Sequence, residues 1–189
     1  ANPPILKGTA TYIFRNNGAL EITLKGDIRE NAPILPRLGI EFIMNEENED
    51  IVYFGLGETE TYADRYKSAR FGKYALTVTD NFVHYIRPQE NSAHVDTRWV
   101  SVTNILGHGL AAIAKSKTFS FNCCHYTAEQ ITATAHDYEL VPVKETVVNI
   151  DYRNAGIGSN SCGPELDEKY RIPLPEASGE ITLKLFSRK

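Results

Sequence analysis

Short alternating runs of hydrophobic and polar residues recur along this chain and predict a protein built almost wholly from β-strands. The first two runs, 9–14 and 19–24, flank Asn16-Asn17-Gly18, a combination that is typical of a β-hairpin. The same alternation predicts further strands at 38–44, 51–54, 82–86, 97–102, 110–114, 118–123, 146–152 and 180–186. The acidic tip at 45–50 reads as a solvated turn, because it lacks the ligand spacing of a cation-binding loop.

Helical signals are few. Thr127 and Gln130 form a capping box ahead of a short helix over 127–135, and a second short helix is expected near 64–69. No internal repeat, linker or low-complexity tract divides the chain. Many short strands with turn residues between them indicate a sandwich or a barrel. We therefore expect one all-β domain over residues 1–189, a large antiparallel β-sandwich with one or two short helices.

The composition of the chain limits the classes of partner that it is expected to bind. The 189 residues are 42% hydrophobic, which is enough for a core, and 20 basic against 24 acidic residues give a net charge of -4. This balance argues against nucleic acid and anionic membranes as partners. No apolar run approaches the roughly 20 residues that span a bilayer, and no signal peptide is visible. The abrupt start suggests a fragment of a larger protein, for which we expect a cytoplasmic location.

Cysteine usage and motifs give little sign of a catalytic or metal site. Cys123, Cys124 and Cys162 make an odd count that does not suggest a disulfide framework, and Cys123-Cys124-His125 lacks zinc spacing. Carboxylates are plentiful, but the sequence alone places no two of them at the separation that glycoside hydrolysis needs. Nucleophile-elbow and phosphate-loop patterns are absent. We therefore predict no catalytic residue and no metal ligand in this chain.

A glycine-rich loop follows the strand-like run 147–152. Three glycines and two serines occupy the eight positions of Gly156-Ile157-Gly158-Ser159-Asn160-Ser161-Cys162-Gly163. Glycine is used where a backbone takes a positive φ or allows a close approach. Ligand approach and a tight turn between two strands both explain this composition.

Three other segments combine aromatic and charged residues: 62–66, 87–91 and Arg98-Trp99. Sugars stack on aromatic rings and need paired hydrogen-bonding groups, so these segments could bind a sugar. Ion pairs between arginine and carboxylates could equally fix long loops to a sheet. The residues by themselves favour the structural role.

These segments, in this order, resemble the C-terminal domain of family 2 β-galactosidases over almost the whole chain. The landmarks that carry the resemblance are Leu35-Pro36-Arg37-Leu38-Gly39, Tyr53-Phe54-Gly55-Leu56-Gly57, Glu60 with Tyr62, Asp64 and Arg65, Tyr85-Ile86-Arg87-Pro88-Gln89-Glu90-Asn91, Arg98-Trp99, Phe119-Ser120-Phe121, Tyr126-Thr127, and Asp151-Tyr152-Arg153 leading to Gly156-Ile157-Gly158-Ser159-Asn160-Ser161. The resemblance implies a supersandwich similar to galactose mutarotase. It also implies a retaining galactosidase whose catalytic glutamates lie in a separate (β/α) barrel.

The resemblance assigns roles as well. Gly158, Ser159, Asn160 and Cys162 match the loop that reaches the substrate, and Cys162 stands where well-known members carry a tryptophan platform for the aglycone. Cysteine offers no stacking face. The resemblance implies no cofactor in this chain, because the magnesium and sodium ions of the family are bound mainly in other domains. Residues expected to anchor loops are Tyr62, Asp64, Arg65, Glu90, Arg98 and Trp99, with Asp64–Arg65 and Glu90–Arg98 as possible buried pairs.

Partners follow from the same resemblance. They are the catalytic barrel and other domains of the parent enzyme and a galactoside such as lactose, with a second copy of the chain as a further candidate. The family domain begins with strands that this chain lacks, so we expect an exposed edge with self-association, or a shifted arrangement of the first strands. Two alternatives stay open: an autonomous carbohydrate-binding or mutarotase-like module, and a purely structural dimerisation domain.

Overall fold

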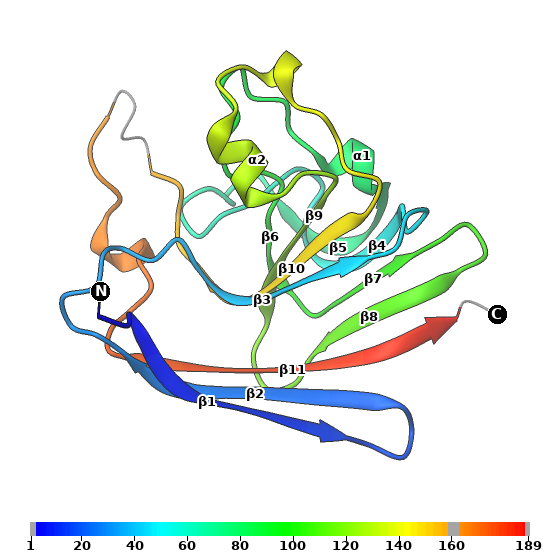
Figure 1. Ribbon diagram of the computed structural model, residues 1–189, viewed down its shortest axis with the longest axis horizontal. Coiled ribbons are helices and arrows are strands. Elements are labelled where there is room, and N and C mark those ends of the chain that lie inside the picture. Colours follow the sequence, from blue (N-terminus) through cyan, green and yellow to red (C-terminus); the bar gives the residue numbers. More distant parts are fainter. Residues whose placement is uncertain (1–2, 159–162, 188–189) are drawn as a thin grey trace.

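Two antiparallel β-sheets form the body of the protein (Figure 1). The structure is a computed structural model that describes residues 3–158 and 163–187. Within these residues the larger sheet has seven strands, in the order β1-β2-β11-β8-β7-β4-β5. Their bounds are β1 Leu6–Phe14, β2 Ala19–Ile28, β4 Asp50–Gly57, β5 Arg70–Thr77, β7 Trp99–Thr103, β8 His108–Ala114 and β11 Glu176–Ser187. The all-β sandwich predicted from the alternating pattern is confirmed.

The smaller sheet has four described strands in the order β3-β10-β9-β6. Their bounds are β3 Arg37–Met44, β6 His94–Thr97, β9 Phe119–Cys124 and β10 Thr146–Asn154. The register of β10 on β3 shifts between Asp151 and Arg153, which is the sign of a β-bulge. The bulge lies immediately before the glycine-rich loop, so it helps to set the direction in which that loop leaves the sheet.

The core lies between the sheets and follows the period of two in each strand. The larger sheet contributes Ile51 and Tyr53 from β4, and the smaller sheet contributes Phe121 from β9 and Ile150 from β10. All four are at most 1% exposed. Burying side chains of this size contributes roughly 1.5–3 kcal/mol each, so the alternating pattern fixes which face of each strand turns inward.

One predicted helix is present and one is not. The capping box of Thr127 and Gln130 starts α2, Ala128–Ala133, as expected. A second short helix, α1, spans Val78–Asn81 and is capped by Thr77. The helix expected near 64–69 is wrong: the backbone there turns between Tyr62 and Arg65, which form an isolated β-bridge. None of the helices among the described residues is long and apolar enough to cross a membrane.

Two strand predictions also need correction. Residues 82–86 are irregular, because the amide of Val83 donates to the side chains of Asn91 and Ser92 rather than to a neighbouring strand. The run 97–102 is divided between two strands, since Thr97 ends β6 in the smaller sheet and Trp99 begins β7 in the larger one. Strand β5 was not expected at all, and it forms by pairing along the full length of β4.

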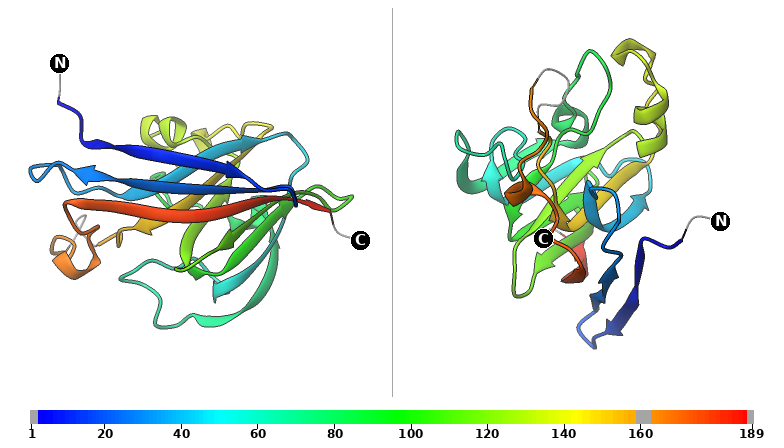
Figure 2. Two further views of the ribbon diagram at one scale, coloured as in Figure 1. Left: turned by 90° about the horizontal axis from the view of Figure 1, so that it is seen from below. Right: turned by 90° about the vertical axis from the view of Figure 1, so that its left-hand side faces the viewer.

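The larger sheet extends beyond the smaller one. The β1–β2 hairpin projects from the body of the sandwich (Figure 2). Tyr12 and Phe14 pair with Ile22 and Leu20, so they lie on the side of the sheet that faces the core. Yet Tyr12 is 60% and Phe14 81% exposed, and Leu185 on β11 is 80% exposed. We call Tyr12, Phe14 and Leu185 the uncovered face. The predicted self-association through this region stays a prediction.

Candidate functional site

The glycine-rich loop leaves β10 through a stem that one carboxylate holds in place. Asp64 accepts hydrogen bonds from two successive backbone amides, from Ile157 to Oδ1 at 3.1 Å and from Gly158 to Oδ2 at 2.8 Å. A side chain on Gly156 would place its Cβ 2.5 Å from Cγ of Asp64, so this close approach requires glycine. The stem is therefore shaped around Asp64.

Further bonds fix both sides of the stem. The amide of Ala155 donates to the carbonyl of Pro36 at 2.9 Å, and the amide of Gly156 donates to the carbonyl of Tyr170 at 2.9 Å. Gly158 takes a positive φ of 67°. A shallow cavity of about 290 Å³ lies here, lined in part by Asp64, Arg65, Gly158 and Tyr170. Ser159, Asn160 and Cys162, which the resemblance assigns to the substrate, lie outside the described residues.

The turn that carries Asp64 is itself fixed. Tyr62 and Arg65 exchange two backbone hydrogen bonds of 3.0 and 2.9 Å across it, and Tyr62 is fully buried. The guanidinium of Arg65 pairs with the carboxylate of Glu60 and donates to the hydroxyl of Tyr85 at 3.1 Å. Glu60 also accepts from the amide of Ser92 at 2.6 Å. Asp64 is thereby positioned by a turn whose own polar groups are satisfied.

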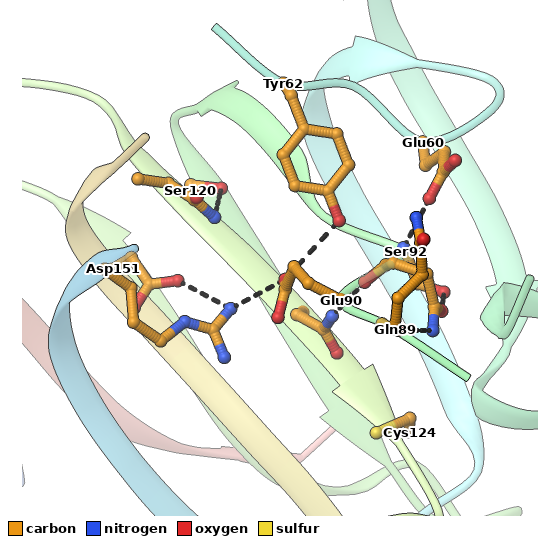
Figure 3. A network of polar contacts seen from close by, with 12 residues as sticks. Glu60, Tyr62, Gln89, Glu90, Ser92, Ser120, Cys124 and Asp151 are labelled. Carbon is orange, nitrogen blue, oxygen red and sulfur yellow. Dashed lines mark hydrogen bonds and ion pairs between the residues drawn. The ribbon is translucent and has the colours of Figure 1, made fainter. Parts of the chain in front are cut away.

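Beneath this turn, one arginine nitrogen lies between two carboxylates (Figure 3). Nη2 of Arg37, on β3, is 3.1 Å from Oε1 of Glu90 and 3.1 Å from Oδ2 of Asp151. Tyr62 directs its hydroxyl to the same Glu90 oxygen at 3.4 Å. The three elements that meet here are β3, the end of β10 and the loop before β6. This network therefore ties the base of the glycine-rich loop to the segment that carries Asp64.

Burial dominates the electrostatics of the network. The side chain of Asp151 is 1% exposed, and burial raises its pKa to about 7 although Arg37 lowers it. The carboxylate of Glu90 adds a like charge that raises the same pKa. Gly39 on β3 makes room, since a Cβ there would lie 2.4 Å from Oδ1 of Asp151. The single positive charge of Arg37 thus compensates the negative charges of the two carboxylates only in part.

The two pairs proposed from the sequence are wrong. Among the ion pairs of the described residues, Arg65 pairs with Glu60 rather than Asp64, and Glu90 pairs with Arg37 rather than Arg98. Arg98 lies over the ring of Phe71 at 5.5 Å. Trp99 lies in β7 of the larger sheet. Neither Arg98 nor Trp99 joins the network at the loop.

Sequence reasoning missed the roles of Arg37, Glu60 and Asp151 as network members. All three lie within the landmarks that carry the family resemblance, and this was the available signal. The carboxylate of Glu60 is engaged by Arg65, Tyr85 and the amide of Ser92, and that of Asp151 is engaged by Arg37. In the part of the chain that the structure describes, no cluster of three or more acidic, histidine or cysteine side chains is arranged to hold a metal ion.

Comparison with known proteins identifies a family that this sequence matches. Residues 1–184 match the family described as the β-galactosidase small chain. Over 172 residues, 91% of this chain, the sequence is 40% identical to a β-galactosidase of Staphylococcus xylosus. It is 36% identical over 161 residues, 85% of the chain, to a β-galactosidase of Actinobacillus pleuropneumoniae. A Lactococcus lactis β-galactosidase is 32% identical over 177 residues, 92% of the chain. The matched segment spans 15–17% of the length of these three relatives.

Proposed function

Because this chain belongs to the β-galactosidase small-chain family, we propose that it forms a non-catalytic β-sandwich domain of a β-galactosidase. The observation that carries the proposal is the match over residues 1–184 against relatives of which it spans only 15–17%. The parent enzyme hydrolyses terminal β-galactosides with retention, by two glutamates in another domain. Any magnesium or sodium ions of the parent are bound mainly outside this chain.

Within that enzyme the chain supplies scaffold and one loop at the rim of the active site. Asp64 supports this role, because it anchors Ile157 and Gly158 directly before the residues assigned to the substrate. Galactoside contact belongs to Ser159, Asn160 and Cys162. Without the catalytic glutamates the isolated chain is inactive.

The chain contacts the rest of the enzyme through apolar surface. Tyr12, Phe14 and Leu185 of the uncovered face support this part of the proposal, because they turn toward the core side of the larger sheet yet stay largely exposed. Contiguous exposed apolar surface is typical of interaction sites. The partners are the catalytic barrel and the other domains of the parent.

The test transplants the chain into a relative. In the S. xylosus β-galactosidase, the matched segment is replaced by this chain, with Asp64 intact or changed as Asp64→Asn. The unchanged chimera is expected to hydrolyse a nitrophenyl β-galactoside. Asp64→Asn should lower kcat/KM about fivefold, since an amide cannot accept from both backbone amides and one loop bond is lost.

The control is Glu129→Gln, a carboxylate-to-amide change on an exposed position of α2 that should leave kcat/KM unchanged. Thermal unfolding of each chimera separates loop effects from folding defects. An inactive but folded chimera would contradict the family role. Equal kcat/KM for Asp64→Asn and the unchanged chimera would contradict the role of the loop.

A further inference from the structure

A second cavity lies at the other end of the sandwich, away from the glycine-rich loop. Its volume is about 470 Å³, within the range of roughly 300–1,000 Å³ that small-molecule sites occupy. Three separate segments form its walls: the β3–β4 turn, α1 with the residues after it, and the chain around His125 and Val143. The floor is apolar, with Val78 fully buried and Phe82 7% exposed.

Aromatic rings form one wall of this cavity. Phe82 contacts Tyr126 with ring centroids 4.5 Å apart and His84 with centroids 5.0 Å apart. Phe82 is buried, whereas Tyr126 is half-buried and His84 is exposed. The rings of Tyr126 and His84 can therefore be covered by a ligand while Phe82 supports them. The apolar faces of sugar rings and of other flat ligands pack on such surfaces.

A histidine–carboxylate pair stiffens the opposite side. Nδ1 of His125 lies 2.9 Å from the carbonyl of Glu145, and Nε2 lies 2.7 Å from Oε2 of Glu49. A carbonyl and a carboxylate only accept, so neither ring nitrogen of His125 is left to accept from a ligand. Oε1 of Glu49 accepts from the amide of Thr79 at 2.8 Å. These groups are engaged with one another and form a rigid wall.

His84 offers a free hydrogen-bonding atom. Its Nδ1 donates to Asp137, 2.8 Å from Oδ1 and 3.0 Å from Oδ2. Because Asp137 engages Nδ1, Nε2 is the ring atom that remains for a ligand, and the described residues supply no partner for it. The hydroxyl of Tyr126 and the amino group of Lys144 add donors to the lining. The site thus presents aromatic surface beside both donors and acceptors.

The charges of the residues that line the cavity favour a neutral ligand over an ion. The lining holds two carboxylates, Glu47 and Glu49, of which Glu49 is paired with His125, and one lysine, Lys144, so neither sign of charge is in clear excess. A site built for an ion would carry an excess of the opposite charge. We propose that this cavity binds a neutral monosaccharide unit, which lies against Tyr126 and His84 and directs its hydroxyls to Nε2 of His84 and to Lys144. The inference is independent of the rim loop.

The test is an NMR titration of the isotope-labelled chain with methyl β-galactoside and methyl β-glucoside in separate arms. Saturable amide shifts are expected at Thr79, Tyr126 and Val143. Tyr126→Ala should weaken binding about fivefold by removing the stacking face. Tyr126→Leu keeps apolar packing on Phe82 without a ring, so it separates stacking from misfolding and should weaken binding as well.

The matched control is Tyr138→Ala, because Tyr138 is 82% exposed, stacks on His136 and does not line the cavity. Its affinity should equal that of the unchanged chain. Binding with either sugar that Tyr126→Leu weakens supports the inference. No saturable shift with either sugar would overturn it. Shifts that Tyr126→Leu leaves unaltered, or that cluster at Ile157 and Gly158, would overturn it too.

Discussion

Arg37 shows how much a single side chain connects in this molecule. Its Nη2 lies 3.1 Å from Glu90 and 3.1 Å from Asp151, so it joins β3 to β10 and to the loop before β6. Asp151 is 1% exposed, and an unpaired buried charge is costly. Removal of Arg37 would leave two carboxylates facing each other without a cation.

The first prediction follows from this contact. Arg37→Met keeps the apolar stem and removes the charge, and it should lower the free energy of unfolding by about 3 kcal/mol in urea at neutral pH. Arg37→Lys should recover part of the loss. Arg15→Met removes an exposed arginine paired with Glu21 and serves as the control, with little effect expected. Equal stability of the Arg37 and Arg15 variants would contradict the network.

His94 gives a second prediction at this scale, because its hydrogen bonds define its protonation. The amide nitrogen of Asn81 donates to the carbonyl of Cys123 at 3.0 Å, so Asn81 Oδ1 accepts from Nε2 of His94 at 2.7 Å. Nδ1 of His94 therefore accepts from the hydroxyl of Tyr53 at 3.0 Å. His94 is 1% exposed, and burial lowers its pKa to about 4.

As the pH falls, His94 therefore takes up a proton at a higher pH in the unfolded chain than in the folded chain. Between pH values near 6.5 and near 4 this residue should make stability fall as the pH falls. Urea unfolding at pH 7 and pH 4.5 measures the loss, and His94→Gln should reduce it. Exposed His136→Gln is the control. A His94→Gln variant with the same pH dependence as the unchanged chain would refute the assignment.

Residue partners were the least predictable feature. Arg37 and Glu90 are 53 positions apart, and nothing local in either segment selects the other. Sequence reasoning paired residues that are close in the chain, Asp64 with Arg65 and Glu90 with Arg98. Only the folded topology brings β3, β10 and the loop before β6 together, so the correct pairs depend on long-range contacts.

At the scale of elements, prediction succeeded where the signal is local. Asn16-Asn17-Gly18 forms the β1–β2 turn, with Gly18 at a φ of 79°. The capping box of α2 is present as both of its hydrogen bonds. Prediction failed where tertiary context decides. Residues 82–86 alternate like a strand, yet the amide of Val83 donates to the side chains of Asn91 and Ser92, and none of the described strands pairs with this segment.

The capping box of α2 allows a prediction about the stability of this helix. Thr127→Ala removes the hydroxyl that accepts from the amide of Gln130 at 3.2 Å and should cost about 1 kcal/mol of local helix stability. Because α2 buries no side chain, the loss should appear as faster hydrogen exchange at Ile131, by about fivefold. Thr132→Ala, within the same helix, is the control. Unchanged exchange in Thr127→Ala would contradict the capping role.

At the scale of the whole molecule, the two sheets do not match in width. The uncovered face exposes Tyr12, Phe14 and Leu185 on the core-facing side of the larger sheet. We predict that the isolated chain self-associates through this face, and that a double variant, Tyr12→Ser with Phe14→Ser, is monomeric. Light scattering across a concentration series measures the mass.

A double variant at a similarly exposed apolar site is the control for the Tyr12 and Phe14 double variant. Ile105 and Leu106 in the β7–β8 turn are 90% and 71% exposed, so Ile105→Ser with Leu106→Ser removes similar apolar surface elsewhere. This variant should associate like the unchanged chain. A monomeric unchanged chain at high concentration would contradict a role for the uncovered face in self-association.

We propose that this chain completes a galactosidase without supplying its catalytic groups. The most direct measurement combines the purified chain with S. xylosus β-galactosidase truncated to remove the matched segment, and follows hydrolysis of a nitrophenyl β-galactoside. We predict no hydrolysis by either part alone and activity after mixing. Hydrolysis by the isolated chain, or full activity of the truncated enzyme without it, would contradict this role of the chain.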